Sequence, residues 1–239
     1  MQTLTIMRKK TSGYILQFLI LSSLLICPMY AFAQNKKDKE KTENVKLYQG
    51  TTIGVEVAGL GNYVLGSDII GSEVMLQANL LNRFLPVLEV GYGKVNTISD
   101  ATDIRYKTAA PFFKIGADYN FFYNKPHLPG FLYGGIRYGF SSLVYDVDGP
   151  TMTDPNYGGQ IQVPFSYHGV NTTAHWLELV GGMKVRIYKG FCMGWSVRYK
   201  KRLSYTKYPN TEPWYIPGYG ENAGTGFTLS YHLMYNLPF

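Results

Sequence analysis

Apolar and polar residues alternate with a period of two along most of the chain, in eight separate segments. In the last of them, Phe227, Leu229 and Tyr231 alternate with Thr228 and Ser230. Successive side chains of a β-strand point to opposite faces, so this period predicts strands with one apolar and one polar face. The segments lie at about 50–60, 72–82, 86–95, 110–121, 131–142, 174–187, 191–202 and 225–239.

Short and long connections alternate between these segments. The short turns lie near 82–86, 122–130 and 188–190, and the long loops lie near 61–71, 96–109, 143–173 and 203–224. This rhythm is typical of outer-membrane barrels, which have short periplasmic turns and longer outer loops. The alternation alone also fits a soluble exported barrel that binds a ligand, with its apolar face turned inward, so that alternative stays open.

Aromatic residues gather near the ends of the predicted strands, where a spanning barrel carries two belts of aromatic side chains at the lipid headgroups. The expected turn-side belt is Phe84, Phe121, Phe122, Phe131, Tyr188 and Phe191, and the expected loop-side belt is Tyr92, Phe112, Tyr145, Trp176 and Tyr199.

The N-terminal region has the three parts of a secretory signal peptide. Arg8 to Lys10 form a basic start, 15–26 is an apolar core, and Ala31-Phe32-Ala33 offers small residues at a cleavage site. We therefore expect a signal peptide over 1–33, a charged periplasmic leader over 34–47 and a barrel over 48–239. Cleavage removes Cys27 and leaves Cys192 without an intramolecular disulfide partner.

Composition excludes several other classes. Only 16% of the 239 residues are charged against 46% hydrophobic, and the mean hydropathy is -0.11. A disordered chain and a helical membrane protein are thereby disfavoured. The net charge of +7 falls by the three cations of the signal peptide to +4. The basic excess is concentrated in the predicted leader, so we expect no nucleic-acid partner.

The C-terminal segment carries a recognisable pattern, formed by Tyr231, Leu233, Tyr235, Leu237 and the final Phe239. It resembles the terminal signal that the outer-membrane assembly machinery reads. Together with the signal peptide, it is similar to small eight-stranded outer-membrane barrels of Gram-negative bacteria, and most of all to a Bacteroides-type family without a known function. Pro238 departs from the polar residue usual at that position.

This resemblance implies an all-β, eight-stranded antiparallel up-and-down transmembrane barrel in the bacterial outer membrane. It also implies contact with the assembly machinery, with outer-membrane lipid and with lipopolysaccharide. The expected role is structural or surface-interacting.

The polar faces of the predicted strands carry five acids and six bases, which would line the barrel interior. They are Glu56, Glu73, Glu89, Lys114, Asp118, Arg137, Glu178, Lys184, Arg186, Arg198 and Lys200. The turn at 188–190 should bring Glu178 roughly opposite Lys200 and Arg202. Because an eight-stranded barrel is just wide enough to be filled by its side chains, we expect a plug of paired charges. A narrow path for ions or small solutes is the alternative.

Catalysis has little support in the sequence. Lipid-modifying outer-membrane barrels use a His-x-Ser pair, and none of His127, His168, His175 and His232 is followed two residues later by Ser. We expect no catalytic residue, no cofactor and no metal site, with a lipid-modifying enzyme as a further alternative. His168 and His175 form only a weak metal-binding pattern.

The remaining candidates for binding lie at the loop end. Loops 143–173 and 203–224 are rich in Tyr and Trp, which suit either a recognition surface for an extracellular ligand or a packed cap. Lys94 and Lys201 lie at strand ends with outward parity, where lysine can reach lipid phosphates. We therefore expect both to contact lipopolysaccharide.

Overall fold

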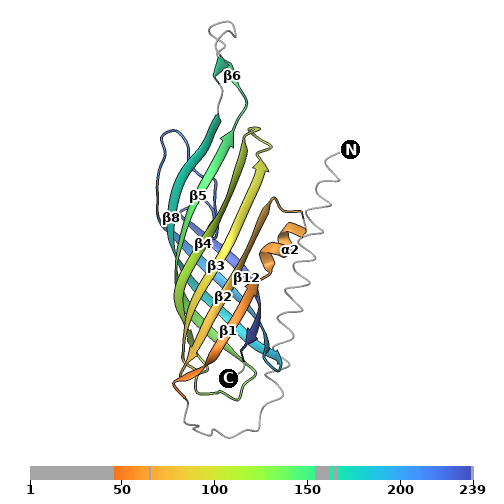
Figure 1. Cartoon of the computed structure of the whole chain (residues 1–239), viewed down its shortest axis with the longest axis vertical. Helices are drawn as coiled ribbons and strands as arrows, with labels where there is room; N and C mark the ends of the chain where they lie inside the picture. The colour runs from red at the N-terminus through yellow and green to blue at the C-terminus, as the bar shows by residue number, and fades with distance from the viewer. Residues whose placement is uncertain (1–45, 65, 154–161, 164–165, 238–239) are drawn as a thin grey trace.

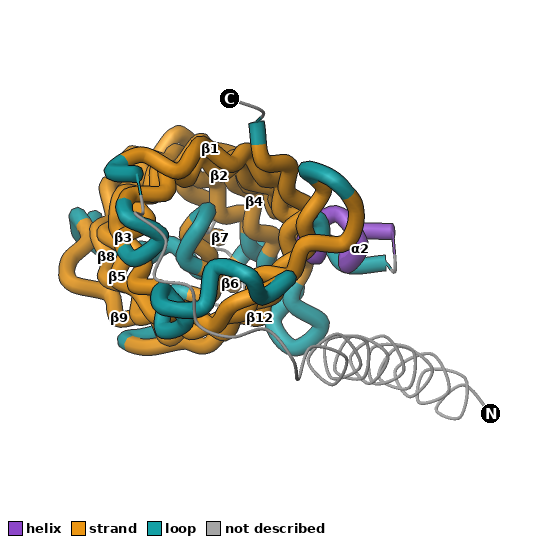
Figure 2. The backbone as a smooth tube through the Cα atoms, turned by 90° about the horizontal axis from the view of Figure 1, so that it is seen from below, coloured by secondary structure: helices purple, strands orange, loops and turns teal. Residues whose placement is uncertain are grey.

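A computed structural model describes residues 46–64, 66–153, 162–163 and 166–237. Eight long strands form one closed antiparallel barrel in the order β1-β12-β9-β8-β5-β4-β3-β2 (Figures 1 and 2). Their bounds are β1 Tyr48–Glu56, β2 Ile69–Leu80, β3 Phe84–Ile98, β4 Arg105–Asn120, β5 Gly130–Asp148, β8 Ser166–Tyr188, β9 Phe191–Tyr205 and β12 Thr225–Asn236. Every long strand pairs with its neighbour in the chain, and β1 pairs with β12 to close the ring.

All eight predicted segments are strands, and the expected eight-stranded up-and-down barrel of the outer-membrane type is confirmed. Its apolar side chains face outward: Phe227 on β12 is 76% exposed and Ile115 on β4 is 63% exposed. Glu89 and Glu178 occupy inward-facing positions of β3 and β8, which alternate with the outward-facing ones, and both are completely buried. This distribution is the reverse of a water-soluble barrel and the one that a lipid environment selects.

Two predicted loops are shorter than expected, because the strands beside them are longer. β3 continues to Ile98 and β4 starts at Arg105, so the connection predicted at 96–109 consists of residues 99–104. β5 and β8 pair as far as Asp148 and Ser166, which makes much of 143–173 a projecting hairpin (Figure 1). Two short strands, β6 Met152–Thr153 and β7 Gln162–Val163, pair within its remaining loop.

The first predicted segment ends four residues early. The Glu56 carboxylate at the end of β1 accepts hydrogen bonds from the backbone N–H groups of Ala58 and Gly59, which starts helix α2 at Ala58–Val64. This local bond offers the chain an alternative to continuing the strand.

Helix α2 covers a part of the barrel wall that β1 does not reach. Pairing of β1 stops at Val55 with β2 and at Glu56 with β12, although both neighbours continue beyond it. α2 contacts both of these neighbouring strands and lies at the rim of the ring in Figure 2. A Cβ on Gly59 would lie 2.2 Å from the carbonyl oxygen of Gly71 on β2. The helix can approach the strand edge this closely only because residue 59 has no side chain.

The barrel has a turn end and a loop end. The turn end carries the connections 81–83, 121–129 and 189–190, and the loop end carries 57–68, 99–104, 149–165 and 206–224. Loop 206–224 contains a small hairpin, β10 Tyr215–Ile216 with β11 Gly220–Glu221. No helix in the described part of the chain is long and apolar enough to cross a membrane.

The predicted signal peptide, almost all of the predicted leader, and Phe239 of the C-terminal pattern lie outside the described residues. The rest of that pattern is described. Tyr231, Leu233 and Tyr235 lie on β12 with outward parity, and Leu237 follows the end of that strand.

Candidate functional site: the barrel interior and its loop cap

Four carboxylates and four cations meet in the middle of the barrel and form one network of ion pairs. They are Glu73, Glu89, Asp118 and Glu178 with Lys114, Arg137, Arg198 and Lys200. All eight side chains are buried, and they come from six different strands. The equal number of opposite charges makes the group neutral, which offsets the cost of removing each charge from water.

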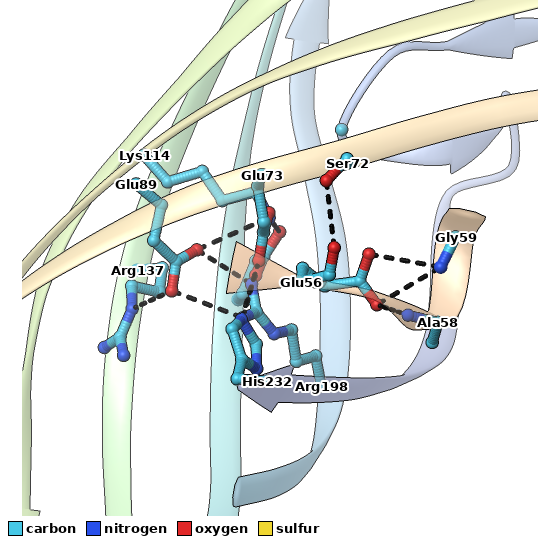
Figure 3. A network of polar contacts seen from close by, with 12 residues as sticks. Glu56, Ala58, Gly59, Ser72, Glu73, Glu89, Lys114, Arg137, Arg198 and His232 are labelled. Atoms are coloured by element: carbon cyan, nitrogen blue, oxygen red, sulfur yellow. Dashed lines mark hydrogen bonds and ion pairs between the residues drawn. The ribbon is translucent and has the colours of Figure 1, made fainter. Parts of the chain in front are cut away.

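Glu89 lies at the centre of this network (Figure 3). Its carboxylate accepts hydrogen bonds from Arg198 Nη1 at 2.8 Å and Arg198 Nη2 at 3.2 Å, and from Arg137 Nε at 3.3 Å. Lys114 Nζ lies 3.5 Å away. Three cations from β4, β5 and β9 thus converge on one carboxylate of β3, which ties distant parts of the wall together.

A second carboxylate, Glu73 on β2, extends the network towards the closing seam of the barrel. It pairs with Lys114 at 2.5 Å and with Arg198 at 2.8 Å, and His232 Nε2 of β12 lies 3.4 Å from it (Figure 3). The parity of His232 on the last strand predicts an interior position, and the side chain is buried there as expected.

Ten of the eleven predicted interior residues have inward-facing, buried side chains, but two of the ten stand apart from the network. Glu56 caps α2 and makes no ion pair with a described residue. Lys184 instead donates hydrogen bonds to Thr52 and Gln77. The eleventh, Arg186, was wrongly placed: it is exposed at the turn end, because its strand position lies beyond the closed part of the interior. The alternation along β8 correctly predicts that Arg186 lies on the same face as Lys184. It does not predict that Arg186 lies at the exposed turn end of the barrel.

Loop 206–224 folds back over the network and closes the loop end. Lys200 Nζ donates to the backbone carbonyls of Gly218 at 2.8 Å and Tyr219 at 3.1 Å. Burial raises the pKa of the Tyr219 hydroxyl, which stays protonated and donates to the carbonyl of Ala223. Lys200, on the interior face of β9, thus anchors loop 206–224 through two backbone carbonyl groups of the loop.

The underside of this cap is aromatic. Tyr106 stacks on Trp214 with ring centroids 5.6 Å apart and donates its hydroxyl to the carbonyl of Tyr215. Trp176 packs edge-on against Tyr219 and donates its indole N–H to Glu178. The cap and the charge network are thus bonded to each other.

Three members of the predicted loop-side belt belong to this inner cluster instead. Phe112, Tyr145 and Trp176 are buried inside the barrel, so their placement in a lipid-facing belt was wrong. The loop packs against them and gives them an apolar environment within the lumen. Outward aromatic side chains remain at both ends, and the exposed ones include Phe84, Phe121, Tyr188 and Phe191 near the turns and Tyr92 near the loops.

The projecting hairpin holds a polar cluster in which the order is Ser-x-His, the reverse of the His-x-Ser pattern of lipid-modifying barrels. Ser166 Oγ lies 2.7 Å from His168 Nε2, and Asp146 and Asp148 lie 3.9 and 3.2 Å from the imidazole. The Ser166 hydroxyl also donates to Asp148 at 2.8 Å. The hydroxyl is therefore shared between an imidazole and a carboxylate. His168 is 64% exposed, so water surrounds the group.

Other reactive groups are sparse. The described residues contain no cluster of three or more His, Cys, Asp or Glu side chains suited to a metal ion. His175 contacts Tyr138 through its Nδ1 atom and packs against Phe140, away from His168. Cys192 is free and buried. Lys94 and Lys201 are both exposed on the outer surface, at the loop-end half of β3 and β9.

A closed barrel with an apolar outer face and a charged, filled interior defines a membrane β-barrel. The chain belongs to the family described as a domain of unknown function (DUF6048), which matches residues 14–239. No curated protein sequence matches it. Among solved structures, it is similar to Neisserial surface protein A (NspA), with 14% sequence identity, a TM-score of 0.40, and coverage of 82% of this chain and all of that one.

Proposed function

We propose that this protein is an integral outer-membrane barrel that does not conduct and that presents its loop end for structural or surface interactions. The observation that carries the proposal is the combination of an apolar outer face with an interior filled by paired charges and closed by a folded loop. A cleaved signal peptide and a Gram-negative, Bacteroides-type origin are part of the same proposal and rest on the sequence.

The outer face supports location in the outer membrane. Exposed Leu, Ile, Val and Phe side chains alternate with interior polar residues on all eight strands, and closure of the ring leaves no unpaired sheet edge over most of the wall. Gel mobility with and without boiling tests this location. A shift on boiling, with retention in the membrane fraction after carbonate washing, is expected. Recovery of an unshifted protein from the soluble periplasm would overturn the proposal.

The filled interior supports a structural plug rather than a channel. Glu89 and Glu178 are fully buried, and each lies within ion-pair distance of three cations on other strands. Planar-bilayer recordings of the purified protein should give no current steps above the lipid baseline. Regular unitary steps that disappear on boiling would instead establish the alternative of a narrow path for ions or small solutes.

The loop end supports a surface role. The β5–β8 hairpin projects beyond the other strands (Figure 1), and the neighbouring loop 206–224 is anchored by its buried aromatic residues. A projection formed by paired strands on an anchored base can present a surface to a partner at low entropic cost. Deletion of residues 150–164 should reduce adhesion of expressing cells to a surface without changing the boiling shift. Unchanged adhesion would contradict this role.

We infer no catalytic function, and the Ser166–His168 cluster allows a direct test of that inference. Its exposure to water disfavours an activated nucleophile. Purified protein should not release labelled fatty acid from phospholipid or lipopolysaccharide. Turnover that is lost in Ser166→Ala, but kept in Ser142→Ala on the same hairpin, would establish the enzyme alternative.

A further inference from the structure

The turn end of the barrel contains a cavity of about 630 Å³, lined by the start of β1 and by the turns 121–129 and 189–190. This volume lies within the range of about 300–1,000 Å³ that is common for small-molecule sites. The inner end of the cavity reaches Lys184 and Asn120, which are both buried.

The charges around this cavity are of one sign. Five cations line it, and none of its described lining residues is Asp or Glu: the cations are Lys46, Lys125, Lys184, Arg186 and Lys189. The cavity of about 980 Å³ at the loop end is the opposite, since it is lined by Asp68, Glu212 and Glu221 and by no Lys or Arg. The basic lining is therefore a property of the turn end and not of the whole barrel.

Lys184 places its side-chain nitrogen at the inner end of this cavity. The side chain is 7% exposed, and its Nζ donates to Thr52 Oγ1 at 2.7 Å and to Gln77 Oε1 at 3.4 Å. No ion pair joins Lys184 to a described carboxylate, and Asp118 is paired with Arg137 at 2.7 Å. Neutral oxygen atoms solvate an ammonium group only in part, and a buried charge is normally paired with an opposite one.

We propose that this turn-side cavity binds a small phosphate-bearing anion. Arg186 and Lys189 follow Lys184 on the same β8–β9 hairpin, and Lys125 approaches from the neighbouring turn, so cations surround the cavity from separate segments. A single carboxylate would neutralise one of them. A phosphate or pyrophosphate group offers several oxygen atoms and more than one charge, which matches both the guanidinium and the ammonium donors.

Calorimetric titration of the folded full-length protein in an uncharged detergent, with inorganic pyrophosphate as the probe, tests the proposal. Saturable binding is expected at low salt, and it should weaken as the salt concentration rises. The double variant Arg186→Gln with Lys189→Gln should bind pyrophosphate about tenfold more weakly. Both residues are exposed, so the variant should keep its boiling shift.

The matched control is Lys107→Gln with Lys207→Gln, which removes the same charge from exposed positions at the loop end. It should bind pyrophosphate as the unchanged protein does. An equal loss of affinity in both double variants would overturn the proposal, because the binding would then follow net charge alone. Absence of measurable binding by the unchanged protein would overturn it as well.

A third variant tests the inner end of the cavity. Lys184→Met should abolish the binding, while a retained boiling shift would show that the barrel still folds. Retention of full affinity in this variant would refute the assigned position. If the variant fails to fold, Lys125→Gln gives the same test from the exposed turn and should weaken binding.

A final arm identifies the source of the phosphate. Pyrophosphate binding is repeated in nanodiscs of phosphatidylglycerol and of phosphatidylcholine. If pyrophosphate binds more weakly in phosphatidylglycerol discs than in phosphatidylcholine discs, the cavity takes lipid headgroup phosphate. If pyrophosphate binds equally in the two kinds of disc, the cavity takes a water-soluble compound.

Discussion

Replacement of Glu89 by alanine should be among the most destabilising single changes in this protein. Its carboxylate is completely buried and contacts Arg198, Arg137 and Lys114 within 3.5 Å. The network then holds three carboxylates against four cations, and the uncompensated charge cannot reach water. Breaking a buried ion pair by removal of one partner costs about 3–5 kcal/mol in the free energy of unfolding.

The assay is equilibrium unfolding by urea in detergent micelles, followed by tryptophan fluorescence and by the boiling shift. Asp100→Ala is the matched control, because it removes an exposed carboxylate that makes no ion pair with a described residue. Its effect should stay below about 0.5 kcal/mol. Glu89→Gln keeps the shape of the side chain and one acceptor oxygen, so its cost should fall between the two.

A charge-balanced double variant separates the lost charge from lost packing. Glu89→Leu with Arg198→Met leaves three carboxylates and three cations, and it should be less destabilised than the sum of the two single changes by about 1–3 kcal/mol. The reasoning would be refuted if Glu89→Ala cost less than about 1 kcal/mol, the value of a surface pair. Strict additivity in the double variant would refute it too.

Three further changes probe the wall, the cap and the outer surface. Gly59→Val should displace α2 from the β2 edge and lower the free energy of unfolding by about 1–3 kcal/mol. Gly61→Val on the same helix should have little effect, because a Cβ there meets nothing within 4 Å. Equal results for the two variants in urea unfolding would contradict the close contact of Gly59. Tyr106→Phe removes a hydroxyl that donates to a loop carbonyl at 2.9 Å and should cost about 1 kcal/mol, with faster proteolysis of loop 206–224; unchanged proteolysis would count against the cap. Lys94→Gln with Lys201→Gln should weaken binding of lipopolysaccharide vesicles, and unchanged affinity and stability would exclude the predicted phosphate contacts.

Much of the fold follows from local sequence. The period of two names the strands and their two faces, and short turns such as 189–190 force neighbouring strands to pair in order. Glu178 therefore pairs opposite Lys200 as expected, because a short turn fixes the register between two strands. Arg202 lies opposite Trp176 instead of Glu178. The hairpin between β5 and β8 is different: its length depends on pairing between residues 143–148 and 166–172, and Gly- and Asn-containing sequence there gave the impression of a loop.

Local sequence also determined which charges face the interior, since inward parity is a property of each strand alone. It could not determine which carboxylate meets which cation. Glu89 and Arg198 are 109 positions apart, and their contact depends on how all eight strands are staggered around the ring. Phe112 and Trp176 share inward parity with Lys114 and Glu178, so the alternation already implies that they face the interior. Only the closed structure decided that Arg186 lies beyond the filled interior and that loop 206–224 packs on these two rings. The position of a residue along the barrel axis and the position of a folded loop depend on long-range packing. A period of two reports only which face of its strand a side chain occupies.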